Sequence, residues 1–210
     1  MYLPAHFEET RSELLHGLIR EHGLGTLVVM TADGLEANHI PFELEVGADG
    51  ACTLRAHVAR GNPVWRTFSE DVDALVVFQG AQSYISPSYY PSKQQDGKVV
   101  PTYNYMVVHA CGPLKVVQDA AWLRGLVGRL TDRYEAGRPA PWKVDDAPAD
   151  YVEKMLSAIV GIEIPVRKMA GKWKVSQNRT VPDRAGVVAG LQQQGDENAV
   201  AMSNAVMKAR

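Results

Sequence analysis

Cysteine is scarce in this chain of 210 residues, which contains only Cys52 and Cys111. The two cysteines lie far apart and match no metal-binding or redox-active spacing. This pattern excludes a disulfide framework and predicts reduced, partly buried thiols in a cytosolic protein. The opening residues MYLPAHFEET lack the basic and apolar regions of a secretory signal, and no apolar run approaches membrane-spanning length. We therefore expect a cytoplasmic protein that has no membrane partner.

An excess of positive charge is also absent, because 22 Lys and Arg face 24 Asp and Glu for a net charge of −2. Non-specific binding to nucleic acid depends on clustered Lys and Arg against the phosphates. Any DNA-binding role must therefore rest on a local patch. The basic segment VRKMAGKWKVSQNR, residues 166–179, is the only local candidate. A solvated strand pair that borders a ligand site is an equally good interpretation of it.

The motifs that would identify a nucleotide-binding loop or a metal site are missing as well. The chain has no G-x-G-x-x-G and no G-x-x-x-x-G-K-[ST] pattern, and no His, Cys and carboxylate set has metal-ligand spacing. We therefore expect no metal ion, and any anion that binds should be part of a small ligand.

The residues that are present describe an ordinary globular protein, with 46% hydrophobic and 22% charged residues. Alternating apolar and polar residues predict strands at 26–31, 36–46, 51–59, 73–80, 104–112 and 114–118, and a last strand or pair of strands at 161–175. Helical spacing predicts helices at 10–22, 62–70, 119–135 and 151–160, and one or two more in the tail. Several strands at hairpin spacing, with helices as insertions and ends, predict a mainly β fold with a small antiparallel barrel. We divide the chain into a barrel domain, 1–180, and a C-terminal helical tail that packs on it, 181–210.

Four polar clusters fall at the predicted strand ends: NHIPFE (38–43), HVARGNPVW (57–65), YISPSYYPSK (84–93) with VPTYNY (100–105), and KWKVSQNR (172–179). Each alone has a structural explanation, such as a helix start at Asn62-Pro63 or tyrosines that pack at a barrel rim. Taken together, they favour a ligand site. Arg60 and Asn62 precede a predicted helix whose first N–H groups are unsatisfied, an arrangement that suits a phosphate. The tyrosines suit a flat heteroaromatic ring, so a phosphorylated flavin fits both.

The same four motifs resemble the PaiB family, the FMN-binding negative transcriptional regulators, over nearly the whole chain. The opening MYLPAHFEE resembles the start of that family as well. The resemblance implies a split β-barrel of the pyridoxamine phosphate oxidase type, a bacterial homodimer, and FMN at the subunit interface. Tyr89 and Tyr103 stand where the family pattern has tryptophan, and tyrosine preserves a stacking surface there.

The resemblance also implies which residues bind the cofactor. Asn38 and His39 would lie beside the flavin ring, and His57, Arg60 and Asn62 around the phosphate and ribityl chain. The other wall and the closing segment would come from Tyr84, Ser86, Thr102, Asn104, Tyr105, Lys172, Ser176 and Gln177. Among these residues Arg60 is the first choice, and YISPSYYPSK would form a stiff wall for the flat ligand.

Three functions remain open at this point. The first is a homodimeric regulator in which FMN alters repression, with DNA as a further partner. The second is an FMN-dependent oxidoreductase for a small molecule, in which the cofactor carries the chemistry. His57, His109 or Tyr105 could relay a proton, but no spacing singles out a catalytic residue. The third is a binding or storage module whose pocket is empty or holds heme, with His39 or His109 as the first candidates for an axial ligand.

Overall fold

The computed structural model describes residues 1–209, apart from the side chain of Asp96. The chain forms two compact units, the first built from three stretches of sequence and the second from two. Unit 1 contains residues 1–18, 78–109 and 170–210, and unit 2 contains residues 19–77 and 110–169. The strands β6, β7 and β10 run through both units.

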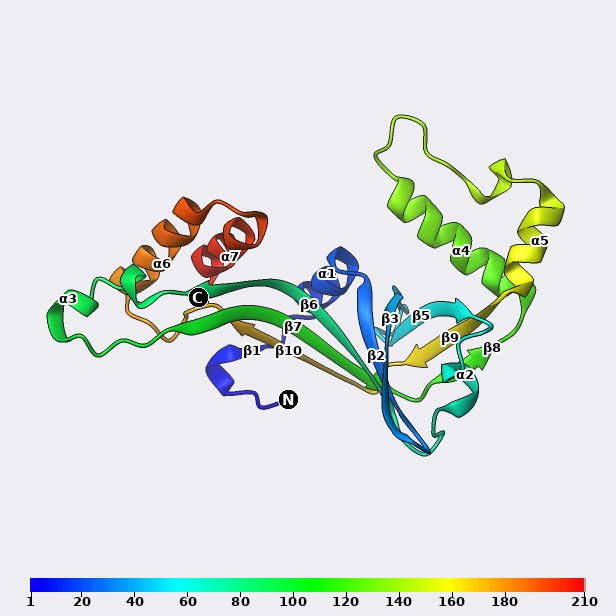
Figure 1. Cartoon of the computed structure of the whole chain (residues 1–210), viewed down its shortest axis with the longest axis horizontal. Helices are drawn as coiled ribbons and strands as arrows, with labels where there is room; N and C mark the ends of the chain where they lie inside the picture. The colour runs from blue at the N-terminus through cyan, green and yellow to red at the C-terminus, as the bar shows by residue number, and fades with distance from the viewer. Residues whose placement is uncertain (210) are drawn as a thin grey trace. The chain divides into compact units, whose positions relative to one another are not determined.

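The strands are β1 (Glu8–Glu9), β2 (Leu24–Thr31), β3 (Gly34–Pro41), β4 (Glu43–Val46), β5 (Cys52–Ala59), β6 (Ala74–Ile85), β7 (Thr102–Gly112), β8 (Lys115–Val117), β9 (Ile159–Pro165) and β10 (Lys168–Lys174). The α-helices are α1 (Ser12–Glu21), α2 (Val64–Thr67), α3 (Lys93–Asp96), α4 (Ala120–Glu135), α5 (Ala149–Ser157), α6 (Val181–Gln194) and α7 (Glu197–Lys208). Short 3-10 turns lie at η1 (Ala5–Phe7), η2 (Pro87–Tyr89) and η3 (Val144–Asp146). Figure 1 labels most of these elements along the chain. No helix among residues 1–209 is both long and apolar enough to cross a membrane.

Unit 2 contains two antiparallel sheets. In one, β2 pairs with β3 on one side and with the start of β6 on the other. In the other, the strand order is β4-β5-β9-β8. The alternation predicted for residues 51–59 is observed, because Leu54, Ala56 and Val58 are buried on one face of β5. Ile162 and Ile164 of β9 are also fully buried, so this face contributes to the core.

The opposite, polar face of the second sheet carries a row of alternating charges. Glu43 faces Arg55 across β4 and β5, Arg55 faces Glu163 across β5 and β9, and Glu163 faces Lys115 of β8. The Arg55 Nε lies 3.1 Å from Oε2 of Glu163. Helix α4 lies on this face, since its Arg129 forms an ion pair with Glu43 at 2.7 Å. Opposite charges across neighbouring strands stabilise this pairing register.

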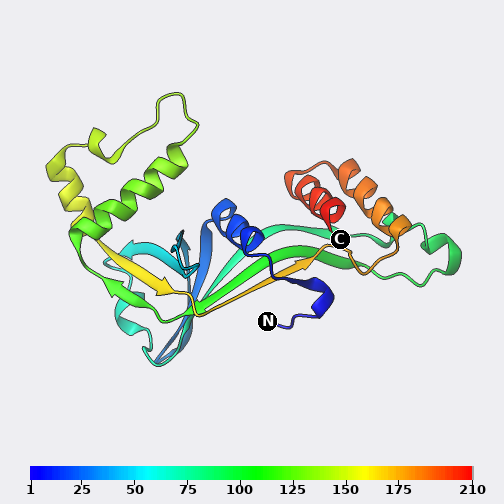
Figure 2. The same cartoon turned by 180° about the vertical axis from the view of Figure 1, so that it is seen from behind.

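Helices α4 and α5 pack on each other and on the second sheet of unit 2 (Figure 2). Their shared core contains Leu123, Val152 and Leu156, with Trp122 partly buried against it. Gly161 of β9 accepts the Trp122 ring, because a Cβ atom at Gly161 would lie only 2.4 Å from Cζ3 of Trp122. The close approach explains why a glycine interrupts this apolar strand.

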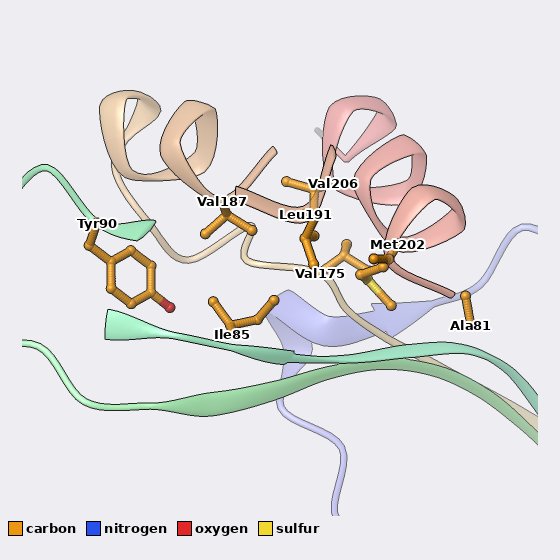
Figure 3. Close-up of a cluster of buried hydrophobic side chains, with 9 residues drawn as sticks. Ala81, Ile85, Tyr90, Val175, Val187, Leu191, Met202 and Val206 are labelled. Carbon is orange, nitrogen blue, oxygen red and sulfur yellow. The ribbon is translucent and has the colours of Figure 1, made fainter. Parts of the chain in front are cut away.

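In unit 1 the strands β1, β10, β7 and β6 lie next to one another in this order, as part of a six-stranded sheet. Helices α6 and α7 cover one face of it, and their apolar side chains meet those of β6 and of the segment after β10 (Figure 3). The buried cluster consists of Ala81, Ile85, Tyr90, Val175, Val187, Leu191, Ala199, Met202 and Val206. Helix α1 covers the same face, since a Cβ at Gly80 would meet both Leu18 of α1 and Met106 of β7.

The predicted strand at residues 36–46 was wrong as a single element. It forms two strands, β3 and β4, which belong to different sheets and pair with β2 and β5 respectively. Phe42 lies between them with a fully buried side chain, and its backbone N–H donates to the carbonyl of Gly23 at 2.8 Å. The chain changes sheets at this buried residue. The predicted domain boundary at residue 180 stays a prediction.

Candidate functional site

The predicted site residues fall into two groups, one in each unit. Asn38, His39, His57, Arg60 and Asn62 belong to unit 2. Tyr84, Ser86, Thr102, Asn104, Tyr105, Lys172, Ser176 and Gln177 belong to unit 1.

In unit 2, Asn38 and Asn62 are in direct contact. The Nδ2 group of Asn62 donates to Oδ1 of Asn38 at 2.7 Å, and the Nδ2 group of Asn38 donates to Glu36 at 2.9 Å. The Oδ1 atom of Asn62 accepts the backbone N–H of Val64 at 2.9 Å. Two residues 24 positions apart therefore form one amide pair where the structure bends into α2. The neighbouring His39 is exposed on the opposite face of β3.

Arg60 lies at the end of β5, and its guanidinium holds the junction between α5 and β9. It donates to the carbonyl oxygens of Ser157 at 2.8 Å and Ile159 at 3.1 Å, and to Oε1 of Gln118 at 3.0 Å. The carbonyls at the C-terminus of α5 attract a cation. Since a guanidinium has five N–H groups, two remain for a ligand.

The helix predicted at residues 62–70 is only a single turn, α2. Its N-terminal dipole is correspondingly small, so the predicted phosphate cradle would depend on side chains more than on helix N–H groups.

His57 lies on the polar face of β5, directly opposite Gly161 of β9. Because Gly161 accepts the ring of Trp122, helix α4 covers this part of the sheet. The Nδ1 atom of His57 is buried and has no hydrogen-bond partner among the described residues. Burial lowers the pKa of His57, so the ring is held neutral. A buried nitrogen with no partner in the chain suits a polar group from a ligand.

In unit 1, Asn104 and Ser176 form a buried pair. The Nδ2 group of Asn104 donates to Oγ of Ser176 at 2.8 Å, and both residues are almost fully buried. Ser176 has a φ of 64°, in the left-handed region that only glycine adopts freely. Residues kept in this region without glycine concentrate at functional sites.

Gln177 fixes the turn that contains Ser176. Its Oε1 atom accepts the backbone N–H of Val175 at 2.8 Å, and its Nε2 group donates to the carbonyl of Trp173 at 2.6 Å. Both polar ends of the side chain are thus used within the turn, and Gln177 shapes the segment around Ser176.

Two lysines of β10 lie beside the aromatic residues of unit 1. Lys172 is buried, its Nζ donates to the carbonyl of Tyr2 at 3.0 Å, and it lies 5.3 Å from the centre of the Tyr105 ring. Lys174, which the sequence did not single out, donates to Oγ1 of Thr102 and to the carbonyl of Tyr103. The alternation of lysine and tryptophan in KWK was the available signal, since it places both lysines on one face of the strand.

The segment 84–93 differs from its predicted role as one continuous wall. Tyr84 is exposed and its ring meets that of Tyr103 edge to face, with centroids 6.1 Å apart. Tyr90 is buried under α6, and Ser92 donates its N–H and hydroxyl to Asp183 of α6. Tyr89 packs into a groove at Gly186 and Gly190 of α6. The second half of the segment therefore anchors the C-terminal helices, and only Tyr84 and Ser86 remain candidates for ligand contacts.

The basic segment 166–179 contributes most of its charges to contacts within its own unit. Arg167 forms an ion pair with Asp73 in unit 2 at 3.0 Å. In unit 1, Lys172 and Lys174 make the contacts described above, and Arg179 lies 4.7 Å from the centre of the Tyr90 ring. Within residues 1–209 no group of three or more His, Cys, Asp or Glu side chains could hold a metal ion.

Comparison with protein families identifies the chain. Residues 1–168 match the family described as "Putative FMN-binding domain". The chain belongs to this family. It is 34% identical to "Protease synthase and sporulation protein PAI 2" of Bacillus subtilis, over 97% of this chain and 95% of the relative. An uncharacterized protein of Aspergillus fumigatus is 32% identical over 98% of this chain and 96% of its own length. The predicted resemblance to the PaiB family is confirmed.

Solved structures show the fold. The FAD and heme binding protein of Mycobacterium smegmatis matches with a TM-score of 0.58 at 20% identity, covering 87% of this chain and 80% of that one. A flavocytochrome of Azotobacter vinelandii matches with a TM-score of 0.57 at 14% identity, covering 84% and 71%. The predicted fold class, a mainly β split barrel of the flavin-binding type, is confirmed.

The family assignment also confirms FMN as the cofactor. The residues of unit 2 fit this group chemically. A neutral His57 with an unpartnered buried nitrogen suits a hydroxyl or ring atom, and the amide pair of Asn38 and Asn62 suits the ribityl hydroxyls. The remaining N–H groups of Arg60 suit a phosphate. When FMN is bound, its isoalloxazine ring supplies the redox chemistry.

Proposed function

We propose that this protein is an FMN-binding regulator that acts as a homodimer. The buried, unpartnered Nδ1 atom of His57 carries the flavin part of the proposal, because such an atom costs stability unless a ligand satisfies it. The proposed unit 2 contacts are Asn38, His57, Arg60 and Asn62, and His39, on the opposite face of β3 from Asn38, stays a predicted contact. Thr102, Asn104, Ser176, Gln177 and Ser86 of unit 1 stay predicted contacts.

An exposed apolar sheet face in unit 2 supports the homodimer. Leu24 and Met30 of β2 and Leu35 of β3 are 62%, 38% and 75% exposed. Met30 lies directly opposite Leu35, so these two side chains adjoin on the outer face. Val28 and Ala37 extend the same face along the strand pair. Met30, Leu35, Val28 and Ala37 thus form one apolar patch, and Thr26 and His39 separate Leu24 from it on the same face. An exposed apolar patch of this kind is typical of an interface between subunits.

The regulatory part of the proposal rests on the PaiB resemblance and on the relative that is named "Protease synthase and sporulation protein PAI 2". The structure offers little for contacts to duplex DNA, since Arg167, Lys172 and Lys174 are engaged within their own units. We therefore propose that flavin binding changes the dimer, and that any DNA contact follows from the assembled dimer.

The second candidate function is an FMN-dependent oxidoreductase. The exposed tyrosine pair of unit 1, Tyr84 and Tyr103, favours it, because an open aromatic surface can accept a small molecule. Anaerobic NADH or NADPH separates the two candidates. Bleaching of the flavin absorbance at a catalytic rate favours the enzyme, and no bleaching combined with a shift of the protein's own upstream DNA favours the regulator.

Flavin binding itself is tested by the absorbance spectrum of the purified protein and by mass spectrometry of the molecule that heat releases. The expected result is FMN at a ratio near one per chain. The variants His57→Phe and Asn62→Ala should each lose most of the flavin, while Lys154→Gln, an exposed residue of α5, should retain it. A colourless wild-type protein that takes up no added FMN would refute the proposal.

A further inference from the structure

In the part of the chain that the structure describes, the α-helices that pack on the sheet of unit 1 lie on one face of it, and the backbone of Tyr2 reaches the other face at Lys172. Helices α1, α6 and α7 cover the side that carries Ile85, Met106 and Trp173. Since side chains alternate between the two faces along a strand, the other side carries aromatic and cationic residues from every second position of β6, β7 and β10. We call this the tyrosine face; its members are Gln82, Tyr84, Tyr103, Tyr105, Lys172 and Lys174.

The rings of this face are open to a flat molecule. Tyr84 and Tyr103 are 48% and 54% exposed, although they are large and partly apolar. They meet edge to face at 6.1 Å with an angle of 68° between the ring planes, so each ring keeps a side turned outward. Aromatic rings exposed on a sheet face provide the stacking surface on which nucleobases bind.

The charges of the face complement an anion. Among the described residues, no carboxylate forms an ion pair with Lys172 or Lys174. Glu8 of β1 lies opposite Lys172 in register, yet it forms no ion pair with it. An ammonium group has three N–H donors. Lys172 uses one of them for Tyr2, and Lys174 uses two for Thr102 and Tyr103.

Lys174 lies within the influence of two other cations. Burial, together with the charges of Lys172 and Arg179, lowers the pKa of Lys174. A bound dianion would relieve this repulsion, since phosphate accepts several charge-assisted hydrogen bonds at once. Lys174 keeps one N–H donor for such a group, and the charges of Lys172 and Arg179 favour an anion beside it.

We propose that the tyrosine face binds a nucleotide other than FMN, with its base stacked on Tyr84 and Tyr103 and its phosphate at Lys174, while the buried ammonium of Lys172 adds positive charge beside it. Tyr84 was predicted as a flavin contact, and it is assigned to this second ligand instead. Tyr103 and Lys174 are new members of a site. Such a ligand would serve as the reaction partner or effector of the flavin protein, and in this respect the inference rests on the proposed function.

The test uses the FMN-loaded protein and three probes: adenosine 5′-monophosphate, adenosine and ribose 5-phosphate. Equilibrium dialysis should show the strongest binding for the monophosphate, because only it combines the ring with the phosphate. Tyr103→Leu should weaken the binding of both adenosine and the monophosphate about tenfold. Lys174→Gln should weaken the two probes that carry a phosphate, also about tenfold, and leave adenosine unchanged, and Lys174→Arg should restore the binding of both phosphates.

Matched controls come from α5, where Tyr151→Leu and Lys154→Gln remove an exposed ring and an exposed ammonium elsewhere. Both should leave probe binding unchanged. Flavin content, read from the ratio of flavin to protein absorbance, should be equal in all variants.

Three results would overturn the inference. The first is equal binding of all three probes, or of none, to the wild type. The second is loss of FMN from Tyr103→Leu or Lys174→Gln, which would place the cofactor itself on this face while FMN binding stands. The third is a change in oligomeric state in either variant, which would show that a second copy covers the face.

Discussion

The side-chain amide of Asn104 donates to the hydroxyl of Ser176 at 2.8 Å, and Ser176 is held at a φ of 64°. One buried hydrogen bond thus joins β7 to a turn that a serine adopts only with strain. In this backbone conformation a serine is less stable than a glycine, because its Cβ atom is strained at a positive φ. The hydroxyl must therefore contribute something that glycine lacks, and the buried amide of Asn104 is its partner.

Two substitutions at Ser176 separate the strain from the hydrogen bond. Ser176→Ala keeps the strained backbone and leaves the buried amide of Asn104 without an acceptor, so we expect a loss of about 1–3 kcal/mol in unfolding free energy. Ser176→Gly loses the same acceptor but relaxes the backbone, so it should be more stable than Ser176→Ala by about 1 kcal/mol. Urea denaturation measures both values. Equal stability of the two variants would show that the turn is not strained.

The stability of unit 2 should depend on pH through His57. Burial lowers the pKa of His57 in the folded protein, so at low pH the unfolded chain binds a proton that the folded chain does not. The contribution is fully present above the unfolded pKa, near 6.5, and is lost as the pH falls below it. We expect the unfolding free energy of the flavin-free protein to decrease from pH 7.5 to about 5.

His57→Gln should reduce this decrease, because glutamine does not titrate. Part of the decrease should remain, because burial also lowers the pKa of His109 in unit 1. An unchanged pH profile in His57→Gln would contradict the burial of the neutral ring.

Arg60 should affect both the fold and the flavin. Arg60→Ala removes the donors to the carbonyls of Ser157 and Ile159, so the junction of α5 and β9 should become less stable. The same variant should also bind less FMN, because it loses the N–H groups predicted to contact the phosphate. Gln118→Ala is the matched control, since it removes only one partner of Arg60 and no predicted flavin contact. Calorimetry and flavin absorbance are measured on the same samples. Full flavin content in Arg60→Ala would remove Arg60 from the site.

The packing of Tyr89 against α6 predicts that one glycine substitution in this helix can be compensated by truncating the Tyr89 ring, and that another cannot. A Cβ at Gly190 would lie 2.3 Å from Cδ1 of Tyr89, whereas a Cβ at Gly186 would lie 2.0 Å from its backbone oxygen. Both Gly190→Ala and Gly186→Ala should destabilise the protein, by about 1–3 kcal/mol or more. Adding Tyr89→Ala should rescue Gly190→Ala, because the ring is gone, and fail to rescue Gly186→Ala. A double-mutant cycle in urea measures the coupling.

A charged side chain introduced into the proposed dimer interface should separate the subunits. Leu35→Lys places an ammonium on the outer face of β3, where the side chain is 75% exposed, so the subunit should still fold while the dimer dissociates. The control variant Val200→Lys changes an exposed residue of α7, and the protein should remain dimeric. Sedimentation at several concentrations gives the oligomeric state. A dimer of unchanged affinity in Leu35→Lys would place the interface elsewhere.

Local sequence determined most of the elements. Alternation of apolar and polar residues located β2, β5 and β7, and helical spacing located α4 and the tail helices, because both signals depend on residues only a few positions apart. Four short motifs were enough to recognise the family, since motif residues carry their identity without a structure. Lys174 was not predicted as a site residue, because a single lysine on a strand belongs to no recognisable motif.

Tertiary structure decided what each motif residue contacts. The sequence placed all the tyrosines of YISPSYYPSK in one wall, whereas Tyr90 is buried under α6 and Tyr89 fits against two glycines about 100 positions later. It offered Arg60 as a phosphate ligand, whereas three of its N–H groups hold carbonyl or amide oxygens of unit 2. These partners are distant in sequence, so no local pattern encodes them. They are selected by the requirement that buried polar groups find partners and that side chains fill space in the packed chain.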